Sequence, residues 1–343
     1  MRKTTGKLII GLVAILILTI CGWFYYSGVM ERSAVSSDIN PISYEAHYAM
    51  ITADENSPLW NAVYQSAAKE AKADGAYLEY MKNDSMSDYT MIDFMKMAIN
   101  AKVAGILVQG NGSDALKAQI ADAKSAGIPV VTMMQDSTDS ERVSFVGVND
   151  YELGKTYGQE VLKHVTDNTK NILVLLDKEK NQEETSLMYT QMKDVIIRGV
   201  GDPPIYSVSS QLVSSENTFD SEESIRTILL SDNRPDILVC LNETNTESAY
   251  QALIDYNMVG KVQLVGYYQS NIIFSGIENG IISFTVSVSA DELGKQAADA
   301  INEYKTMGYV SNYISVQLEV IDSGNVGTYK TEPSDSGGDS SVQ

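Results

Sequence analysis

The sequence predicts an α/β fold made of two lobes, each a doubly wound (Rossmann-like) parallel sheet with helices on both faces. Apolar strand-like runs alternate regularly with helical patterns from residue 44 to residue 321, and this alternation is typical of parallel sheets. It occurs as two successive series, the second of which begins near Asp150. The length of 343 residues also exceeds that of a single typical core, so two lobes are expected from size as well.

The composition narrows the possible function classes. Hydrophobic residues make up 44% and charged residues 20% of the chain, which is ordinary for a globular protein. The formal net charge of −20 argues against nucleic-acid binding, because contact with a phosphate backbone needs clustered Lys and Arg. Cys21 and Cys240 cannot form a disulfide framework, and we expect Cys240 to be a small buried core residue. His47 and His164 lack the paired spacing of a metal site.

The N-terminal residues predict a membrane anchor. Three positive residues precede the uncharged segment 8–26, which is about long enough to span a bilayer. This charge pattern places the N-terminus in the cytoplasm and the bulk of the chain outside. We favour residues 1–26 as a cytoplasmic tip and an uncleaved transmembrane helix (a signal-anchor), followed by a stalk at 27–43.

Two alternatives to the uncleaved anchor stay open. The first is a cleaved signal peptide, although small residues at a cleavage site are hard to find in this segment. The second is a lipoprotein signal that ends at Cys21, although Ile20 stands where that motif has a small residue.

The first strand–loop–helix unit contains the first candidate site residues. An apolar strand at 48–52 is followed by a polar loop and then by Ser57 and Pro58. These two residues are a helix-start signal, since Ser can cap a free backbone N–H and Pro suits the first helical position. Ligands of open parallel sheets bind beyond the carboxyl ends of the strands. The loop residue Asn56, and Trp60 one turn into the helix, are therefore candidates, with a solvated surface turn as the alternative.

The rest of the first series is predicted from helix signals and from the apolar runs between them. Apolar residues recur four apart in 89–101, and Ser113 and Gly127 are the start and stop signals of the helix that follows. Strands are expected at 77–80, 103–108, 130–133 and 143–148.

The second series has the same character. Gly154 and Gly158 in its first helix are small enough to allow close helix packing. Helices are expected at 151–165, 184–198, 221–230, 245–256, 271–279 and 290–304. Strands are expected at 172–176, 205–208, 237–241, 262–267, 282–288 and 314–321. The Ser-, Gly- and Asp-rich tail at 331–343 is expected to be disordered.

One stretch matches a cofactor motif in a loose form. Gly110-Asn111-Gly112-Ser113-Asp114-Ala115 follows a strand and opens a helix, with Asp136 at the end of the next strand, as in a dinucleotide-binding fingerprint. We favour a plain helix N-terminus capped by Ser113, because a nicotinamide cofactor is not expected outside the membrane. The sequence contains no P-loop, no Gly-x-Ser-x-Gly elbow and no His-Glu-x-x-His motif. It therefore predicts no cofactor, no metal site and no catalytic residue.

Three further loops follow predicted strands, and each has two interpretations. The charge-rich loop at 177–184 is most simply solvated surface, although Asp177 could face a ligand cleft. Tyr267 and Tyr268 form either a packing rim or a stacking platform. Asn242 either binds a ligand hydroxyl or caps the next helix.

Several short stretches also follow one another in a characteristic order and spacing. They are Asn56-Ser57-Pro58-Leu59-Trp60, Gly105-Ile106-Leu107-Val108, Ala126-Gly127-Ile128-Pro129-Val130-Val131, Val148-Asn149-Asp150, Asn242-Glu243, Val265-Gly266-Tyr267 and Glu278-Asn279-Gly280. Together with the order of the elements they resemble the type 1 periplasmic binding proteins, in particular the ribose-binding-protein-like sugar receptors of ABC transporters. The resemblance covers nearly all of 44–321.

The resemblance implies that hinge crossings near 149–150, 288–289 and 314–316 join the lobes, with a ligand cleft between them that closes on binding. The first lobe would comprise 44–149 and 289–313 and the second 150–288, followed by a C-terminal crossing strand at 314–330. In this family sugars are held by hydrogen bonds to their hydroxyls and by stacking on aromatic rings.

The chain departs from the sugar-receptor pattern at several site positions. Asn242 and Trp60 match the pattern, but Met134-Gln135 replaces an Asp-Arg pair, with Asp136 next. Tyr268 replaces an Asp and Val288 a Gln. The lost polar positions would cost a sugar several hydrogen bonds of ~1 kcal/mol each, so either the ligand is less polar or other loops supply polar groups. The predicted ligand-binding residues are Asn56, Trp60, Gln135, Asp136, Asn242 and Tyr268.

The N-terminal segment and the resemblance together predict a membrane-anchored, extracytoplasmic solute-binding protein that captures a sugar or sugar-like ligand by lobe closure for an ABC importer, and that is not an enzyme. Its partners would be the small-molecule ligand, the membrane through its N-terminal helix, and an ABC permease. A ligand-sensing subunit for a membrane histidine kinase or receptor is the first alternative, and a permanent anchor favours it weakly. An extracytoplasmic enzyme on a doubly wound fold is the second alternative.

Overall fold

The computed structural model describes residues 44–54, 57–83, 86–178, 182–199, 206–214 and 218–330, together with Ile20. The chain divides into two compact units, Met1–Tyr44 and Glu45–Gln343, and the fold below is that of the second unit. Within the described ranges, no helix has both the length and the apolar character that a membrane span requires. The predicted anchor at 8–26 (apart from Ile20), the stalk at 27–43, the site residue Asn56 and the tail at 331–343 lie outside these ranges.

The first lobe is built on a six-stranded sheet in the order β11-β5-β4-β3-β1-β2. All neighbouring strands in this sheet pair in parallel. Its strands are β1 (Ala46–Ile51), β2 (Ala76–Tyr80), β3 (Gly105–Gln109), β4 (Val130–Met134), β5 (Ser144–Gly147) and β11 (Tyr313–Ser315). Its helices are α2 (Pro58–Ala73), α3 (Met91–Asn100), α4 (Asp114–Ser125) and α10 (Ala290–Met307).

The second lobe is built on a six-stranded sheet in the order β12-β10-β9-β8-β6-β7. Its strands are β6 (Asn171–Asp177), β7 (Ser207–Val213), β8 (Ile237–Cys240), β9 (Gln263–Tyr267), β10 (Ile282–Val288) and β12 (Leu318–Asp322). Its helices are α5 (Asp150–His164), α6 (Gln182–Arg198), α7 (Thr218–Leu229), α8 (Glu243–Asp255), α9 (Asn271–Glu278) and the 3₁₀ helix η1 (Val326–Thr328). Only β12 runs antiparallel to its neighbour, β10. The predicted fold of two parallel-sheet lobes is confirmed.

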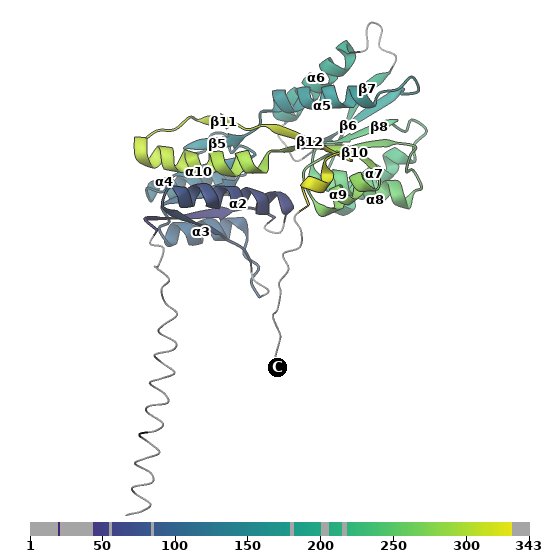
Figure 1. Ribbon diagram of the computed structural model, residues 1–343. Coiled ribbons are helices and arrows are strands. Elements are labelled where there is room, and N and C mark those ends of the chain that lie inside the picture. Colours follow the sequence, from purple (N-terminus) through teal and green to yellow (C-terminus); the bar gives the residue numbers. More distant parts are fainter. Residues whose placement is uncertain are drawn as a thin grey trace, which may run out of the picture. The chain divides into compact units, whose positions relative to one another are not determined.

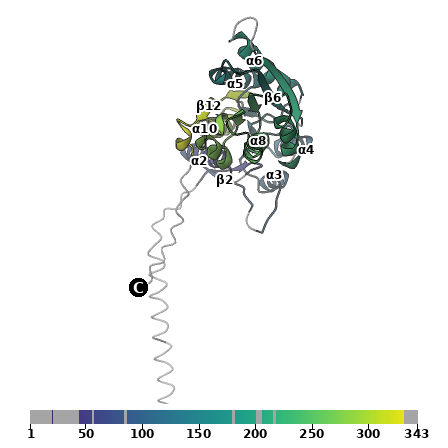
Figure 2. The same ribbon diagram turned by 90° about the vertical axis from the view of Figure 1, so that its right-hand side faces the viewer.

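Helices cover both faces of each sheet. Figure 1 shows α2 and α10 side by side on the first lobe, where Val63 and Ala297 share a core with Met50 of β1. Phe94 of α3 and Leu116 of α4 pack on the opposite face of the same sheet. In the second lobe α5 and α6 lie side by side (Figure 2) and cover one face, whereas α7 and α8 cover the other.

Two glycines allow α5 and α6 to approach closely. A Cβ on Gly154 would lie 2.3 Å from the carbonyl oxygen of Met188, and one on Gly158 would lie 2.7 Å from the Cβ of Val195. Real Cβ atoms do not come this close to other atoms, so any larger residue would push the helices apart. The expectation that these small residues permit close packing is confirmed.

Between its described strands, the chain passes from one sheet to the other three times, after β5, after β10 and between β11 and β12. These crossings are bonded to one another. The N–H of Val316 donates to the carbonyl oxygen of Gly147 over 3.0 Å, and the N–H of Ser289 donates to that of Gln317 over 2.9 Å. The segments that join the lobes therefore form one hydrogen-bonded group.

The prediction of a single strand at 314–321 is wrong. β11 pairs with β5 of the first sheet, and β12 pairs with β10 of the second. The chain changes sheets at Val316 and Gln317, between the two strands. The apolar pattern continues through both strands, so nothing in the sequence marks the change of sheet.

One further strand differs from its predicted position. The strand predicted at 205–208 is β7, which runs over Ser207–Val213. β7 is an edge strand with only two buried residues, so its apolar pattern is too weak to fix its length.

Two local predictions are confirmed. The Oγ of Ser113 accepts a hydrogen bond from the N–H of Leu116 over 3.3 Å and so caps α4. Cys240 in β8 is fully buried.

Candidate functional site

Two adjoining cavities lie at the carboxyl ends of strands from both sheets. The larger cavity has a volume of 480 Å³ and the smaller cavity one of 210 Å³. Met134, Gln135 and Tyr267 line both. Ligands of open α/β sheets bind at such strand ends, so the two cavities together form the candidate binding cleft between the lobes.

The smaller cavity is lined mainly by polar residues from five strand ends. They follow β1, β3 and β4 in the first lobe and β8 and β9 in the second. The lining residues are Ala53, Asp54, Gln109, Met134, Gln135, Asn242, Glu243, Thr244, Tyr267 and Tyr268. The amides of Gln109, Gln135 and Asn242 can both donate and accept hydrogen bonds, so this wall is suited to hydroxyl groups.

The larger cavity lies beside the crossings. Asp136 and Phe145 line it from the first lobe, Leu153 and Met188 from the second, and Val288 from the end of β10. A molecule in this cavity would therefore contact both lobes and a crossing segment at once.

Burial raises the pKa values of two glutamates at or near the smaller cavity. Burial, together with the negative charges of Glu247 and Asp54, raises the pKa of Glu243 to about 8. Burial also raises the pKa of Glu247, although the hydrogen bond that Ser270 donates to it opposes the rise. At neutral pH the Glu243 carboxyl is therefore largely protonated, and it can donate a hydrogen bond as well as accept one.

Asn242 is fixed by hydrogen bonds from both ends of its amide. Its Oδ1 accepts from the N–H of Asn245 over 2.8 Å and caps α8, and its Nδ2 donates to Oδ2 of Asp177 over 3.4 Å. Asn242 is thus both a helix cap and a lining residue of the smaller cavity. Asp177 is buried and lines neither cavity. It is connected to the cleft by the hydrogen bond that it accepts from Asn242.

Tyr268 lines the smaller cavity from the second lobe and has an unusual backbone conformation. Its φ is 88°, a region that residues other than glycine avoid. Its N–H donates to the carbonyl oxygen of Val286 over 3.1 Å, and its own carbonyl oxygen accepts from Oγ1 of Thr285 over 2.9 Å. Burial and the negative charge of Glu243 raise the pKa of the Tyr268 phenol, which keeps the phenol neutral.

The loop after β4 reaches both cavities. Met134 has a φ of 67°, again in the left-handed region. A Cβ on Gly110 would lie only 1.9 Å from the carbonyl oxygen of Gln135. The loop after β3 and the loop after β4 approach so closely that position 110 requires glycine. Packing therefore explains this glycine of the loose dinucleotide fingerprint, and no bound nucleotide is needed to explain it.

Asp136 lines the larger cavity, but its carboxylate is engaged by protein groups. The Nε and Nη2 of Arg142 donate to its two oxygens over 2.5 and 2.7 Å, and the N–H of Ser137 donates over 2.7 Å. Arg142 also donates to the carbonyl oxygen of Asn312 over 2.9 Å. Asp136 therefore fixes the β4–β5 connection against the segment before β11, and sequence analysis did not foresee Arg142 as its partner.

Trp60 lies in the hydrophobic core. It is 0% exposed, belongs to the same buried cluster as Leu59 and Val63, and lines neither cavity. Its truncation would open a hole in this core, so a loss of binding in Trp60→Ala would not by itself show a ligand contact.

Four of the six predicted site residues thus line the cleft, and the other two do not. The structure brings Gln135, Asp136, Asn242 and Tyr268 to the cleft. It places Trp60 in the core, and Asn56 lies outside the described residues. Ligand binding by these residues stays a prediction.

Sequence analysis missed Gln109 and Glu243 as site residues. Gln109 is the last residue of β3, and its Oε1 accepts from the N–H of Ala53 over 2.9 Å. Glu243 is the first residue of α8. Both stand next to the carboxyl end of a predicted strand, so including every polar residue at those ends would have found them.

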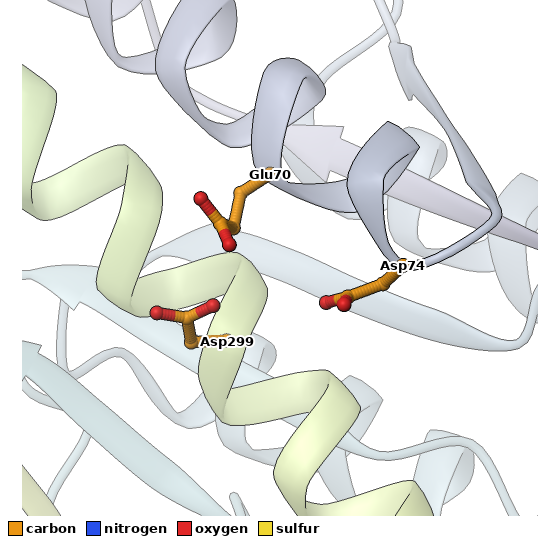
Figure 3. A group of neighbouring side chains, drawn as sticks. All are labelled: Glu70, Asp74 and Asp299. Carbon is orange, nitrogen blue, oxygen red and sulfur yellow. The ribbon is translucent and has the colours of Figure 1, made fainter.

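A separate acidic cluster lies where α2 meets α10 (Figure 3). Carboxylate oxygens of Glu70, Asp74 and Asp299 lie within 4.8 Å of one another. The Nζ of Lys295 lies 3.3 Å from Glu70 and 2.8 Å from Asp299. Lys295 on α10 thus joins Glu70 of α2 to Asp299 of α10 by ion pairs, and none of the residues in the cluster lines the cleft.

Solved structures with the same fold include several sugar-binding proteins. The glucose-galactose binding protein GanP from Geobacillus stearothermophilus matches with a TM-score of 0.68 at 20% identity, over 82% of this chain and 98% of that one. The arabinose binding protein AraP from the same organism matches with a TM-score of 0.72 at 16% identity, over 83% and 99%. The XylFII–LytSN complex matches with a TM-score of 0.63 at 25% identity, over 81% and 98%.

A family model identifies the family, although comparison with curated protein sequences gives no match. The family model of the periplasmic binding protein domain matches residues 48–308, which include both sheets apart from β11, β12 and the start of β1. The match agrees with the two lobes, the cleft at their strand ends and the structural relatives. The chain belongs to the periplasmic binding protein family, as its resemblance to the type 1 members predicted.

Proposed function

We propose that this protein is an extracytoplasmic solute-binding protein that holds a small sugar or sugar-like ligand in the cleft by lobe closure. The observation that carries the proposal is the convergence of polar residues from five strand ends of two lobes on the smaller cavity. A ligand that forms hydrogen bonds to both walls at once binds the closed arrangement more tightly than the open one. It shifts the equilibrium towards closure by this difference in affinity.

The lining favours a ligand with hydroxyl groups and some apolar surface. The amides of Gln109, Gln135 and Asn242 match hydroxyls in both hydrogen-bonding directions. Met134 and the rings of Tyr267 and Tyr268 supply the apolar part of the wall. The structural relatives GanP and AraP are named for sugars, glucose and galactose in one case and arabinose in the other, which supports the same ligand class here.

The cleft favours binding over catalysis. Among its lining residues there is no histidine or cysteine. His47 bonds to Glu79, and His164 stacks on Phe284. Glu243 has the raised pKa of a general acid, but no lining residue is paired with it as an activated nucleophile. We therefore infer that the ligand leaves the cleft unchanged.

Delivery to an ABC importer is the leading role, with the segment 8–26 as the anchor that keeps the binding lobes beside the membrane. A sensor role is the second candidate. It is favoured by the XylFII–LytSN complex, which at 25% identity is more similar in sequence than GanP or AraP and contains a second protein. In that role the closed lobes would dock on a membrane sensor.

A ligand-dependent melting screen tests the proposed function. The full chain is heated with a panel of pentoses, hexoses, amino sugars and polyols. A true ligand at 100 times its dissociation constant should add about 2.7 kcal/mol of stability, and chromatography should recover it unchanged. Protein-dependent conversion of the ligand would contradict the proposal, and so would a panel in which no compound raises the melting temperature.

Copurification from membranes separates the two roles. An importer predicts that a crosslinker traps the ligand-loaded chain with a permease, and a sensor role predicts capture with a membrane kinase or receptor. The wild-type chain loaded with the ligand from the melting screen serves as bait in both cases.

A further inference from the structure

The smaller cavity of the cleft has acidic side chains in its lining and no basic ones. Asp54 follows β1 in the first lobe, and Glu243 is the first residue of α8 in the second. Among the described residues that line this cavity, there is no Lys, Arg or His. The cavity therefore attracts positively charged groups and repels negatively charged ones.

Carboxyl groups of the two lobes act on one another at this cavity. Burial raises the pKa of Glu243 to about 8, and the charges of Glu247 and Asp54 add to the rise. Burial also raises the pKa of Glu247, with a further contribution from the Asp54 charge. Asp54 lies in the first lobe and both glutamates lie in the second, so like charges repel across the cleft. Either a proton on Glu243 or a bound cation relieves this repulsion.

Two aromatic residues also line the smaller cavity. The ring centroids of Tyr267 and Tyr268 lie 6.3 Å apart, with an angle of 38° between the ring planes. Burial raises the pKa of both phenols, so the rings stay neutral. A neutral phenol ring attracts a cation over its face, and a carboxylate forms short, charge-assisted hydrogen bonds with an ammonium group. Aromatic rings and carboxylates in one cavity are therefore suited to an ammonium group.

The remaining lining residues suit the uncharged part of such a ligand. The amides of Gln109, Gln135 and Asn242 can donate hydrogen bonds to hydroxyl groups and accept them. The larger cavity has mixed charges, since Lys117 lines it as well as Asp150. A positive group is therefore better placed in the smaller cavity than in the larger one.

We propose that the smaller cavity binds the ammonium group of an amino sugar or amino polyol, with Glu243 and Asp54 as its counter-charges. The rings of Tyr267 and Tyr268 are its aromatic contacts, and the amides of the same lining bond to the hydroxyl groups of the ligand. This inference rests on the proposed function, since it names the class of ligand that the same cleft holds. A neutral sugar would leave the negative charge of the cavity unbalanced, whereas a cation attracts acidic groups of both lobes.

Binding of an amine should release protons. Glu243 is largely protonated in the empty cavity at neutral pH, because its pKa is about 8. An ammonium group beside it favours the ionised carboxylate and so lowers this pKa. The groups that act on Glu243 are the acidic Glu247 and Asp54, with the neutral phenols of Tyr267 and Tyr268 nearby. A neutral sugar has no charge with which to displace the proton, so its binding should release none.

Titration calorimetry of the full chain with matched pairs of compounds tests the inference. The pairs are glucosamine and glucose, galactosamine and galactose, and N-methylglucamine and sorbitol, and the members of each pair differ at the amino group. At least one amine should bind at least about tenfold more tightly than its neutral partner.

The same titrations measure proton release. They are carried out in phosphate and in Bis-Tris at about pH 6.5, where the amines of the probes and the Glu243 carboxyl are protonated. Because the two buffers have different heats of ionisation, the difference between the two binding heats gives the number of protons released. The amine should release protons, and its neutral partner should release none.

A variant then removes the ionisable group. In Glu243→Gln the ratio of the amine affinity to the neutral-sugar affinity should fall about tenfold, and proton release should be largely lost. Glu222→Gln is the matched control, because it removes one negative charge at an exposed position of α7 that lines neither cavity. It should keep both the ratio and the proton release. Proton release by the wild type is a second test that needs no variant.

The outcomes separate the inference from the proposed function. Tighter binding of an amine with proton release, both reduced in Glu243→Gln, supports the ammonium site. If the compounds that bind show no preference for the amine, if the amine binds without proton release, or if Glu243→Gln keeps both properties, the inference is wrong and the proposed function stands. If neither these pairs nor the melting screen yields a ligand, the proposed function fails, and the inference fails with it.

Discussion

The Asn242 side chain both caps a helix and lines the smaller cavity of the candidate cleft. Its Oδ1 caps α8 through Asn245, its Nδ2 reaches Asp177, and the residue lines the smaller cavity. These two bonds fix the orientation of the amide before any ligand arrives. A preorganised group loses less conformational entropy on binding, so we expect Asn242 to contribute more than a mobile amide would.

We predict that Asn242→Ala weakens binding of the ligand found by the melting screen by roughly 1–3 kcal/mol. The same change removes the cap of α8 and should cost about 0.5–2 kcal/mol of folding stability. Thr90→Ala is the control, because it removes the capping box of α3, whose residues line neither cavity of the cleft. Titration calorimetry should show normal affinity for Thr90→Ala. Equal affinities in both variants would remove Asn242 from the site.

Glu243 makes the stability of the protein depend on pH. Its pKa in the folded chain is about 8 against an ordinary value of 4.5. A carboxyl with a raised pKa contributes fully to stability below the unfolded value, and this contribution is lost as the pH rises through the folded value. The window of loss for Glu243 is therefore from about pH 4.5 to pH 8.

Glu243→Gln should remove this loss, since Gln imitates the protonated side chain. The free energy of unfolding of the variant minus that of the wild type should be larger at pH 8 than at pH 5 by at least about 1 kcal/mol. This figure is reduced because the Glu243 side chain is partly exposed. Urea unfolding at the two pH values measures the difference. Glu222→Gln, at an exposed position of α7, controls for the loss of one negative charge. A constant difference between wild type and Glu243→Gln at both pH values would show that Glu243 is not held in its neutral form.

At the scale of the elements, the β4–β5 connection is fixed by the ion pair of Asp136 and Arg142. Their side chains are 20% and 8% exposed, so little water replaces either partner if the other is lost. Arg142 carries this contact on to Asn312 before β11. The pair therefore stabilises one wall of the larger cavity and the approach to a crossing at the same time.

We predict that Asp136→Asn lowers the free energy of unfolding by about 2–4 kcal/mol, because it leaves a buried guanidinium partly unpaired. Glu141→Gln is the matched control from the same connection, since its pair with Lys124 is exposed and should be worth less than ~1 kcal/mol. Chemical unfolding measures both. Similar small losses in the two variants would show that the Asp136 pair is no stronger than a surface pair.

The α5–α6 contact gives a prediction with an unusual sign. Gly→Ala inside a helix normally stabilises it by roughly 1 kcal/mol. Here a Cβ at position 154 would lie 2.3 Å from the backbone oxygen of Met188, so Gly154→Ala should instead destabilise the protein by about 1–3 kcal/mol. Gln159→Ala, at an exposed position of the same helix, should change stability little. Thermal unfolding of the two variants decides, and a more stable Gly154→Ala would show that the helices can separate without cost.

The elements also show where sequence reasoning reached its limit. Strong local signals were sufficient for α4, where Ser113 caps the helix, and for the buried parallel strands, which are short apolar runs bounded by turn residues. They failed at 314–321, where the apolar pattern runs on while the chain changes sheets. They also failed at β7, whose exposed edge position leaves little pattern.

The candidate site was predictable to a similar degree and for similar reasons. Polar residues next to strand ends, such as Gln135 and Asn242, lie at the cleft because parallel strands share one carboxyl edge. Trp60 lies in the core, because a residue one turn into a helix can face the core as well as the cleft. The partner of Asp136 could not be foreseen, since only the turn of the β4–β5 connection brings Arg142 back to it.

At the scale of the whole molecule, the two sheets that the structure describes differ in topology at one point. Both have six strands, and in the second lobe the last strand is antiparallel. The crossings are hydrogen-bonded to one another through Gly147 with Val316 and Ser289 with Gln317. We expect crossings of this kind to act as a hinge about which the lobes rotate as bodies while each sheet stays intact. Lobe closure on a ligand, rather than change within a lobe, is therefore the motion on which the proposed function depends.

Titration calorimetry of the full chain with the ligand from the melting screen tests the central proposal most directly. It is carried out on the wild type, Gln135→Ala and Thr90→Ala, because Gln135 lines both cavities and Thr90 lines neither. We predict one ligand bound per wild-type chain, recovered unchanged, with an affinity that falls about tenfold or more in Gln135→Ala, equivalent to roughly 1.4 kcal/mol, and stays the same in Thr90→Ala. Unchanged affinity in Gln135→Ala, or heat that continues because the ligand is consumed, would contradict the account of a solute-binding cleft between the lobes.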